Sequence, residues 1–275
     1  MYEIGIVDTR NVIRTVKETY GYDFTDFAIT TFRRRLDNVI NNQKIRDADS
    51  LISRLQTDKS FFDPFLCDIS VDTTEMFRDP SVWRHLRDSI IPDLVKGPTK
   101  PKIWVAGWDS GEELYSLTII LKELNLLNQV QIFASYFSDI KFQKTKSGEI
   151  EAKQAEVNEA NYERFNGTSK LSTYFITKND ITVLDPTLIE GVTFIKQNTI
   201  FDNSPSGIRL ILFRNQMIYY NQGLCDKIAR VMVNSLVPGG YFLLGIKEYL
   251  ELSGVGAAAF TLIDDQEMIY KKKNN

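Results

Sequence analysis

An arginine and an asparagine interrupt an apolar run in RLILFRNQMIYYNQ, the stretch at residues 209–222. A charged side chain at the end of a buried strand is costly to desolvate and is mostly tolerated where a ligand or partner compensates. At the carboxyl end of such a strand, Asn215 could bond a ligand while Arg214 supplies fixed positive charge. Alternatively, Arg214 is a structural residue paired with Asp202 or another acid, and the spacing alone does not decide.

A glycine-containing loop, VAGWDSGEE at residues 105–113, follows the first strand that the sequence predicts. Glycine lets the backbone approach a ligand, and the following helix offers N–H groups at its N-terminus. The loop has only Gly107 and Gly111, so it is not the GxGxxG pattern of dinucleotide-binding sites. Ser110 and Glu113 also fit a helix capping box, and the two roles are compatible.

The acid that would hold a ribose is missing from its expected place. Such a carboxylate is expected at the end of the second strand, about 20 residues after the glycine loop. Here the strand VQIFAS runs into Tyr136, and the first acid is Asp139. Loss of one charged hydrogen bond costs roughly 1.5–3 kcal/mol, which would weaken nucleoside binding.

Polar residues also crowd into TTEMFRD, residues 73–79, just before the α/β part of the chain. Taken alone, the stretch favours a helix N-terminus with Thr73 or Thr74 as its cap. Glu75 and Asp79 would then be solvated charges in the first turn. Direct contact with a ligand is the alternative.

The composition excludes several classes of protein. His85 is the only histidine, so multi-histidine zinc sites are impossible and no metal site is expected. The residue is expected on a helix surface or in a packing role. A formal net charge of −3 gives no general attraction to nucleic acid.

Cys67 and Cys225 lack CxxC spacing and no signal-like N-terminus is visible, which favours a reduced, cytoplasmic protein. No uninterrupted run of about 18 apolar residues occurs, so no membrane span is expected.

The first part of the chain carries helical signals. The apolar residues of ITTFRRRLDNVI share one face of a helix, and its three arginines, Arg33–Arg35, fan across the other side. We predict an N-terminal helical domain over residues 1–72 and a connecting segment over residues 73–97.

From about residue 98 the pattern changes to alternating strands and helices. PKIWVAG predicts a buried strand, and the glycine loop and a leucine-rich helix follow at once. Strand, tight loop and helix form the first unit of a doubly wound, Rossmann-like sheet. Later strands are expected at VQIFAS, GIRLILF and GGYFLLGI, with a closing antiparallel pair at AAAFTLI and EMIYKK. We predict an α/β domain over residues 98–275, with an insertion at about 139–195.

Taken together, these stretches resemble one family, the CheR chemotaxis-receptor methyltransferases, which use S-adenosyl-L-methionine to methylate receptor glutamates. The matching motifs are GYDFTDFAITTFRRRL (21–36), VDTTEMFRDPSVW (71–83), IWVAGWDSGEELYS (103–116), the Asn198 region of VTFIKQNTIF, LILFRNQMIYYNQ (210–222) and LVPGGYFLLG (236–245). They occur in family order. The resemblance implies a small all-α module followed by a Rossmann-like methyltransferase domain with a small inserted subdomain.

The resemblance also implies roles for individual residues. The implied cofactor-binding positions are Asp72, Thr74, Arg78, Glu113, Tyr136, Asn198, Thr199, Asn215 and Gln216. Glu113 would bind the methionine end of the cofactor, and Asn215 and Gln216 would close the pocket at a strand end. Arg78 and Tyr219 would be the catalytic pair. The implied product is S-adenosyl-L-homocysteine, and the implied partners are the cytoplasmic helices of chemotaxis receptors.

The implied reaction suits a chain with a single histidine. A glutamate side chain has a pKa of about 4.3 and is already ionised at neutral pH, so no strong general base is required. The remaining task is alignment and partial desolvation of the carboxylate, with Arg78 and Tyr219 as orienting groups. Arg33–Arg35 could be an ordinary solvated face or a docking face for acidic receptor helices.

Several positions depart from the family's pattern. Tyr136 replaces an acid, and AGWDSGEE, FRNQ and GIKE stand where the family has AGCSTGEE, CRNV and GHSE. These departures motivate an alternative, a catalytically weakened methyltransferase-like adaptor or signalling module that binds a receptor or partner protein. A nucleotide- or sugar-binding Rossmann-like enzyme has only the generic fold in its favour.

Overall fold

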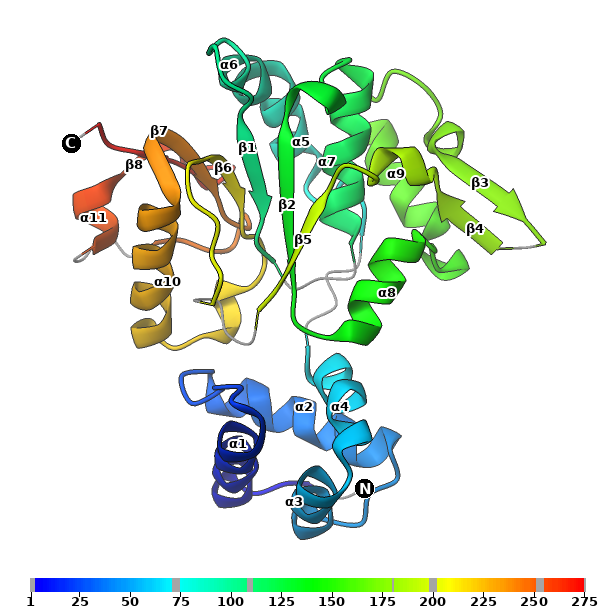
Figure 1. The fold of residues 1–275 in the computed structure, drawn as a ribbon, viewed down its shortest axis with the longest axis vertical. Coiled ribbons are helices and arrows are strands. Elements are labelled where there is room, and N and C mark those ends of the chain that lie inside the picture. Colours follow the sequence, from blue (N-terminus) through cyan, green and yellow to red (C-terminus); the bar gives the residue numbers. More distant parts are fainter. Residues whose placement is uncertain are drawn as a thin grey trace.

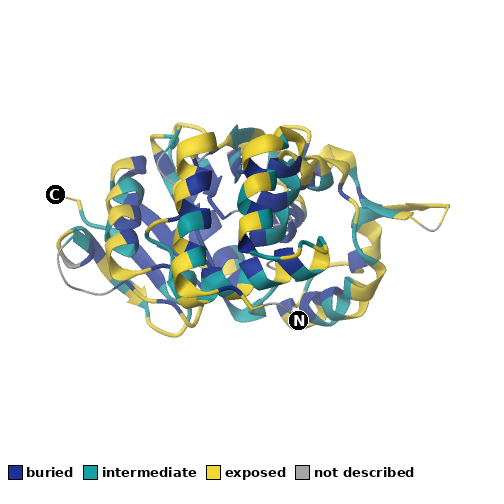
Figure 2. Ribbon diagram, turned by 90° about the horizontal axis from the view of Figure 1, so that it is seen from below, coloured by how far each residue is buried: buried dark blue, intermediate teal, exposed yellow. Residues whose placement is uncertain are grey.

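The computed structural model describes residues 3–70, 75–107, 111–179, 181–197, 202–250 and 255–274. The N-terminal part is helical, with α1 (Ile6–Tyr20), α2 (Ile29–Asn42), α3 (Ala48–Thr57), the 3₁₀ turn η1 (Lys59–Phe61) and α4 (Phe62–Ile69). The predicted apolar face of α2 is confirmed, since Phe32, Leu36, Val39 and Ile40 are its buried residues. Figure 2, seen from the side of these helices, shows buried and exposed stripes alternating along them.

A seven-stranded sheet forms the larger part, in the order β5-β2-β1-β6-β7-β9-β8 (Figure 1). Its strands are β1 (Lys102–Val105), β2 (Gln131–Tyr136), β5 (Thr193–Lys196), β6 (Ile208–Leu212), β7 (Leu236–Leu243), β8 (Phe260–Asp264) and β9 (Ile269–Lys272). The strands from β5 to β7 in this order are parallel, and β9 and β8 close the sheet antiparallel. Strand order reverses between β1 and β6, as in doubly wound sheets. This confirms the predicted Rossmann-like α/β fold.

Helices cover both faces of the sheet because successive strand residues point to opposite sides. Ile103 and Val105 of β1 lie in a core with α7 (Glu112–Glu123), whereas Trp104 lies in a core with α10 (Gln222–Ser235). The helical run on the α7 side comprises α5 (Pro80–His85), the π-helical η2 (Leu86–Ile90) and α6 (Ile91–Leu94). The core on the α10 side continues into the N-terminal helices.

The stretch expected as an insertion contains two helices, a hairpin and one strand of the main sheet. Its elements are α8 (Asp139–Ser147), η4 (Ala152–Gln154), α9 (Ala155–Phe165), η5 (Leu171–Tyr174), β3 (Phe175–Lys178), β4 (Ile181–Leu184), η6 (Pro186–Leu188) and β5. β3 and β4 form a separate two-stranded sheet, whereas β5 pairs with β2. The domain boundaries drawn from the sequence stay a prediction.

Short helical elements complete the fold. They are η3 (Leu127–Gln129), η7 (Met217–Tyr219) and α11 (Val255–Ala259). α11 occupies the alanine-rich start of the stretch expected as a strand, so that strand begins at Phe260. Within the described residues, no helix is both long and apolar enough to cross a membrane.

Candidate active site at the carboxyl ends of the strands

The carboxyl ends of β2, β1 and β6 lie together at one edge of the sheet, because β1 is in parallel register with both neighbours. Loops that follow such strands form the ligand crevice of open α/β sheets. The N-terminal helices face the same edge (Figure 1). The Asp63 carboxylate of α4 accepts hydrogen bonds from the backbone N–H groups of Asp139 and Ile140, both at 2.8 Å. The N-terminal helices are therefore in direct contact with the segment that follows β2 at this edge.

Arg214 is buried just beyond the end of β6 and joins two other segments. Its guanidinium lies 2.7 Å from the carboxylate of Asp79 and 3.1 Å from that of Glu113. It also donates to the backbone carbonyl of Arg78 at 3.2 Å. Arg214 thus has the structural pairing that the sequence left open, with partners other than Asp202. Asp79 is not the solvated charge that the sequence favoured, because it binds this buried cation.

The segment that carries Arg78 has an unusual backbone conformation. Phe77 and the residue after Arg78 have positive φ angles of 53° and 55°, a region that bulky residues rarely adopt. The Phe77 N–H donates to Ser116 Oγ at 2.8 Å, and the Met76 N–H donates to Asn158 Oδ1 at 2.9 Å. Such strain persists where neighbouring groups over-determine it, which is common at functional sites. Arg78 itself is partly exposed.

Two side-chain amides follow β6 and are buried without a partner for their nitrogen atoms. Asn215 and Gln216 are 8% and 2% exposed, and neither Asn215 Nδ2 nor Gln216 Nε2 finds an acceptor among the described residues. A buried donor without an acceptor is costly. These amides therefore fit a ligand that carries hydrogen-bond acceptors, at positions that the resemblance assigns to the cofactor.

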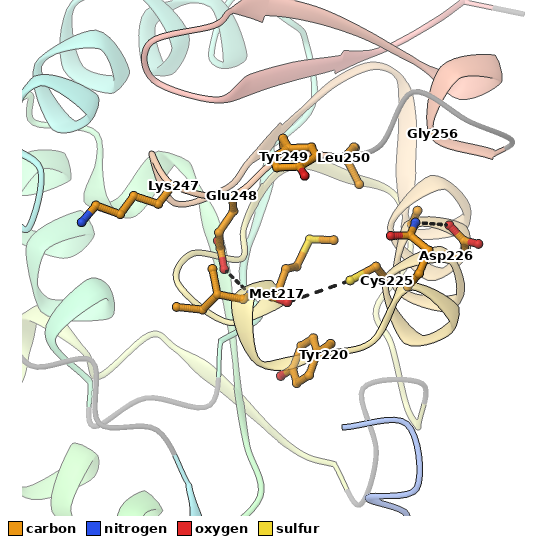
Figure 3. A pocket seen from close by; sticks show the side chains of 12 residues that line it. Met217, Tyr220, Cys225, Asp226, Lys247, Glu248, Tyr249, Leu250 and Gly256 are labelled. Atoms are coloured by element: carbon orange, nitrogen blue, oxygen red, sulfur yellow. Dashed lines mark hydrogen bonds between the residues drawn. The ribbon is translucent and has the colours of Figure 1, made fainter. Parts of the chain in front are cut away.

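A buried carboxylate supports the backbone of the same loop. Asn215 has a left-handed conformation with φ of 57°, and its N–H donates to Glu248 at 2.7 Å. Burial raises the pKa of Glu248, and hydrogen bonds from the backbone N–H groups of Gly245 and Ile218 act against that shift. Figure 3 shows the Glu248 side chain directed toward the turn at Met217, beside a cavity of about 210 Å³.

Tyr219, the expected catalytic tyrosine, lies against the N-terminal helices. The Arg35 guanidinium lies over its ring, 4.4 Å from the centroid, and donates to the Ile69 carbonyl at 2.8 Å. The Ala28 N–H donates to the Tyr219 carbonyl at 2.9 Å. The solvated-face interpretation, one of the two left open for these arginines, is therefore wrong for Arg35, and Arg34 alone of the three is exposed. Its contact with the Tyr219 ring turns Arg35 inward.

Aromatic rings occupy the end of β2, where a ribose-binding acid was expected. Tyr136 stacks on Phe142 with ring centroids 4.4 Å apart, and Phe142 meets the edge of Phe194 at 5.2 Å. Asp139, the first acid after the strand, forms an ion pair with Lys196 at 2.6 Å. The hollow that the described residues leave beside these rings is only about 10 Å³. The tyrosine that replaces the family's acid is thus packed against aromatic neighbours of its own, Phe142 and, beyond it, Phe194.

Four of the expected cofactor-binding positions, Asp72, Thr74, Asn198 and Thr199, lie outside the described residues. The roles of Asn158 and Glu248 were not predicted from the sequence. Glu248 had a signal, since it is the acid of GIKE. Asn158 had none, because it is 82 residues away from its partner Met76.

The lone histidine lies apart from this edge. His85 ends α5, and its Nδ1 lies 3.1 Å from the Asp264 carboxylate. Its place on a partly exposed helix surface agrees with the prediction. Among the described residues, no group of three His, Cys, Asp or Glu side chains could hold a metal ion.

Comparison with known sequences shows to which family the chain belongs. Residues 72–261 match the CheR methyltransferase family, in its S-adenosylmethionine-binding domain. The chain belongs to the CheR methyltransferase family. Cher3 of Pseudomonas putida, whose name describes it as a methyltransferase, is 27% identical over 265 residues, which cover 96% of this chain and 97% of Cher3.

Two further relatives are named as chemotaxis protein methyltransferases. The protein from Listeria innocua is 26% identical over 238 residues, covering 86% of this chain and 88% of its own. Chemotaxis protein methyltransferase 1 from Pseudomonas aeruginosa is 27% identical over 227 residues, which cover 78% of this chain and 80% of that relative. The CheR-family chain therefore aligns over most of the length of these relatives at modest identity.

The described residues fit S-adenosyl-L-methionine better at one end of the site than at the other. Next to β6, the unpaired amide nitrogens of Asn215 and Gln216 offer donors for the acceptor groups of such a ligand. At β2, ribose hydroxyls would meet the Tyr136 ring and an Asp139 carboxylate that already pairs with Lys196. The β6 end of this edge thus offers donors to a ligand, whereas aromatic packing and an ion pair occupy the β2 end.

Proposed function

We propose that this CheR-family methyltransferase transfers the methyl group of S-adenosyl-L-methionine to glutamate side chains on the cytoplasmic helices of chemotaxis receptors. S-adenosyl-L-homocysteine would be the second product. The observation that carries the proposal is that Asn215 and Gln216 are buried and that their amide nitrogens have no acceptor among the described residues. Both residues lie on the same loop as Tyr219. The names of the Listeria and Pseudomonas aeruginosa relatives support the receptor substrate.

The proposal assigns the cofactor to residues on several segments of the site. The residues proposed to hold it are Asp72, Thr74, Arg78, Glu113, Tyr136, Asn198, Thr199, Asn215 and Gln216. We further propose a cytoplasmic location and the division into residues 1–72, 73–97 and 98–275. In this division the helical domain and the connecting segment complete the cofactor edge of the α/β domain.

The proposed chemistry requires positioning more than proton transfer. Bound S-adenosyl-L-methionine supplies an electrophilic methyl group on a positively charged sulfur. A receptor glutamate is ionised at neutral pH, so its oxygen can form the new C–O bond as the C–S bond breaks. Arg78 would orient the carboxylate through its positive charge, with Tyr219 as a hydrogen-bonding neighbour. The N-terminal helices that cover the edge would exclude water.

The test joins cofactor binding with product analysis. We expect S-adenosyl-L-homocysteine to bind in isothermal titration calorimetry, and mass spectrometry to find methyl esters on a purified receptor signalling fragment. Arg78→Ala should lower kcat/KM on the order of 10²-fold, the usual effect of removing one transition-state contact. Arg46→Ala is the control, because Arg46 is exposed and pairs with Asp47 at the start of α3. Absence of methyl esters with the wild-type protein would contradict the proposal.

A second candidate follows from the altered end of β2. The Tyr136–Phe142 stack replaces a carboxylate, which favours a receptor-binding adaptor with weakened catalysis. The two candidates differ in the effect of Tyr136→Asp. An adaptor should bind the receptor fragment without turnover, and the substitution should restore binding of S-adenosyl-L-homocysteine. Robust turnover by the wild-type protein would eliminate the adaptor.

A further inference from the structure

Glu248, in the loop after β7, is a buried carboxylate that lies between two loops. Glu248 is only 2% exposed. Oε2 accepts hydrogen bonds from the backbone N–H groups of Asn215 at 2.7 Å and Gly245 at 2.8 Å, and Oε1 accepts one from Ile218 at 3.2 Å. One side chain therefore links the loop after β6 to the loop after β7.

The linked loops approach each other closely. A Cβ atom on Gly245 would lie 2.6 Å from Asn215 Oδ1, so a side chain there would displace the amide. Asn215 also has a positive φ angle, which costs free energy unless neighbouring groups hold it. Hydrogen bonds to an ionised acceptor are roughly twice as strong as neutral ones. The Glu248 carboxylate supplies that support directly at Asn215.

The contacts also explain why this position carries a carboxylate. The groups that donate to it are backbone N–H groups, and they engage both carboxylate oxygens. A glutamine would turn one NH₂ group toward N–H donors, which leaves donors facing donors. An aspartate would keep the charge, but its side chain is shorter by one methylene.

We propose that Glu248 is a positioning residue for methyl transfer. Its carboxylate sets the backbone from Asn215 to Ile218 and thereby orients the Asn215 and Gln216 amides. The same backbone leads into Tyr219. The assignment of these amides and of Tyr219 to cofactor and catalysis rests on the proposed function, whereas the support that Glu248 gives the loop does not. Glu248 acts through the backbone and is not itself placed against the methyl group.

The test compares Glu248 with a second carboxylate that also accepts three hydrogen bonds. Glu123, in the last turn of α7, accepts from Tyr162, Tyr174 and Thr168. We expect Glu248→Gln to weaken S-adenosyl-L-homocysteine binding at least about tenfold. This factor corresponds to the loss of one charged hydrogen bond that holds the loop in its binding conformation. Glu123→Gln should lower thermal stability to a comparable degree and leave binding unchanged. Glu248→Asp should restore part of the affinity.

Amide hydrogen exchange on the ligand-free protein provides a readout that needs no cofactor. Glu248→Gln should speed exchange at Asn215, Ile218 and Gly245, and Glu123→Gln should not. Wild-type affinity together with unchanged exchange in Glu248→Gln would overturn the inference. If the wild-type protein binds no S-adenosyl-L-homocysteine, the proposed function fails, and the exchange comparison alone still decides the role of Glu248.

Discussion

Arg214 faces two carboxylates in a place that water does not reach. Its side chain is 0% exposed, and the side chains of its partners Asp79 and Glu113 are 18% and 5% exposed. Desolvating such groups is costly, and their attraction offsets the cost only while all of them are present. Removing the cation alone takes away the positive charge that faces both carboxylates. The loss should therefore exceed that of an ordinary hydrogen bond.

We predict that Arg214→Met lowers the free energy of unfolding by about 3–5 kcal/mol, the usual cost of breaking a buried ion pair. Urea denaturation followed by circular dichroism measures the change. Arg34→Met is the control, because an exposed arginine should change stability by less than about 0.5 kcal/mol. Adding Asp79→Asn to Arg214→Met should recover part of the loss. Strict additivity of the two substitutions would show that the charges do not act as a unit.

The sequence identified Arg214 as an anomaly but could not name its partners. Asp79 and Glu113 are 135 and 101 residues away from it, and only the folded chain brings the segment before α5 and the start of α7 to the end of β6. Tyr136 shows the same limit. Its missing carboxylate was visible in the sequence, whereas its stack on Phe142 depends on how α8 turns back onto β2. Residue types can be inferred from sequence, while pairings need the topology.

Strands buried inside the sheet were easier to predict from the sequence than strands whose apolar residues face solvent. β6 and β7 lie inside the sheet, and their apolar runs predicted them. The β3–β4 hairpin carries Ile176 and Ile181 at 51% and 52% exposure, so its apolar residues face solvent and leave no clear period. The boundary between the insertion and the main sheet was also unclear from the sequence, because β5 is a short edge strand in a polar stretch.

An ion-pair cluster joins α8 to η4, just before α9, and makes this connection sensitive to acid. Hydrogen bonds from Lys144 and Lys153 lower the pKa of Glu151 from 4.5 to about 2. A lowered folded-state pKa means that the stabilisation is complete above pH 4.5 and is lost as the pH falls toward 2. Because these side chains are well exposed, the contribution should be below about 1 kcal/mol.

We therefore predict that Glu151→Gln lowers Tm slightly near neutral pH and that the difference from wild type disappears toward pH 2. Thermal unfolding followed by circular dichroism across this range measures it. Glu149→Gln, on an exposed neighbour, is the matched control. A Tm difference that stayed constant with pH would contradict the assigned ion pair.

The N-terminal helices form part of the site at the scale of the whole molecule. A single apolar core runs from α1, α2 and α4 through the sheet face to α10. Polar contacts cross the same boundary, including the hydrogen bond from Tyr22 to the Phe137 carbonyl at 3.3 Å and the Arg35–Tyr219 stack. A part that shares its core with the sheet should hold the site's backbone in place rather than move independently of it.

Asp63 tests this coupling, because it caps α8 from a helix that lies far away in the sequence. Its carboxylate accepts the N–H groups of Asp139 and Ile140, the first residues of α8, where helix donors otherwise lack partners. We predict that Asp63→Ala lowers the free energy of unfolding by about 1–2 kcal/mol, as the loss of a helix cap does.

Urea denaturation measures the stability change, and amide exchange at Asp139 and Ile140 locates it. Asp49→Ala, in the first turn of α3, is the control because its helix start does not contribute to the sheet edge. Faster exchange at both amides with a single cooperative transition would mean that the helices and the sheet unfold together. Unchanged exchange and stability would show that the Asp63 cap adds nothing to this coupling, which would then rest on the shared apolar core and on contacts such as the Arg35–Tyr219 stack.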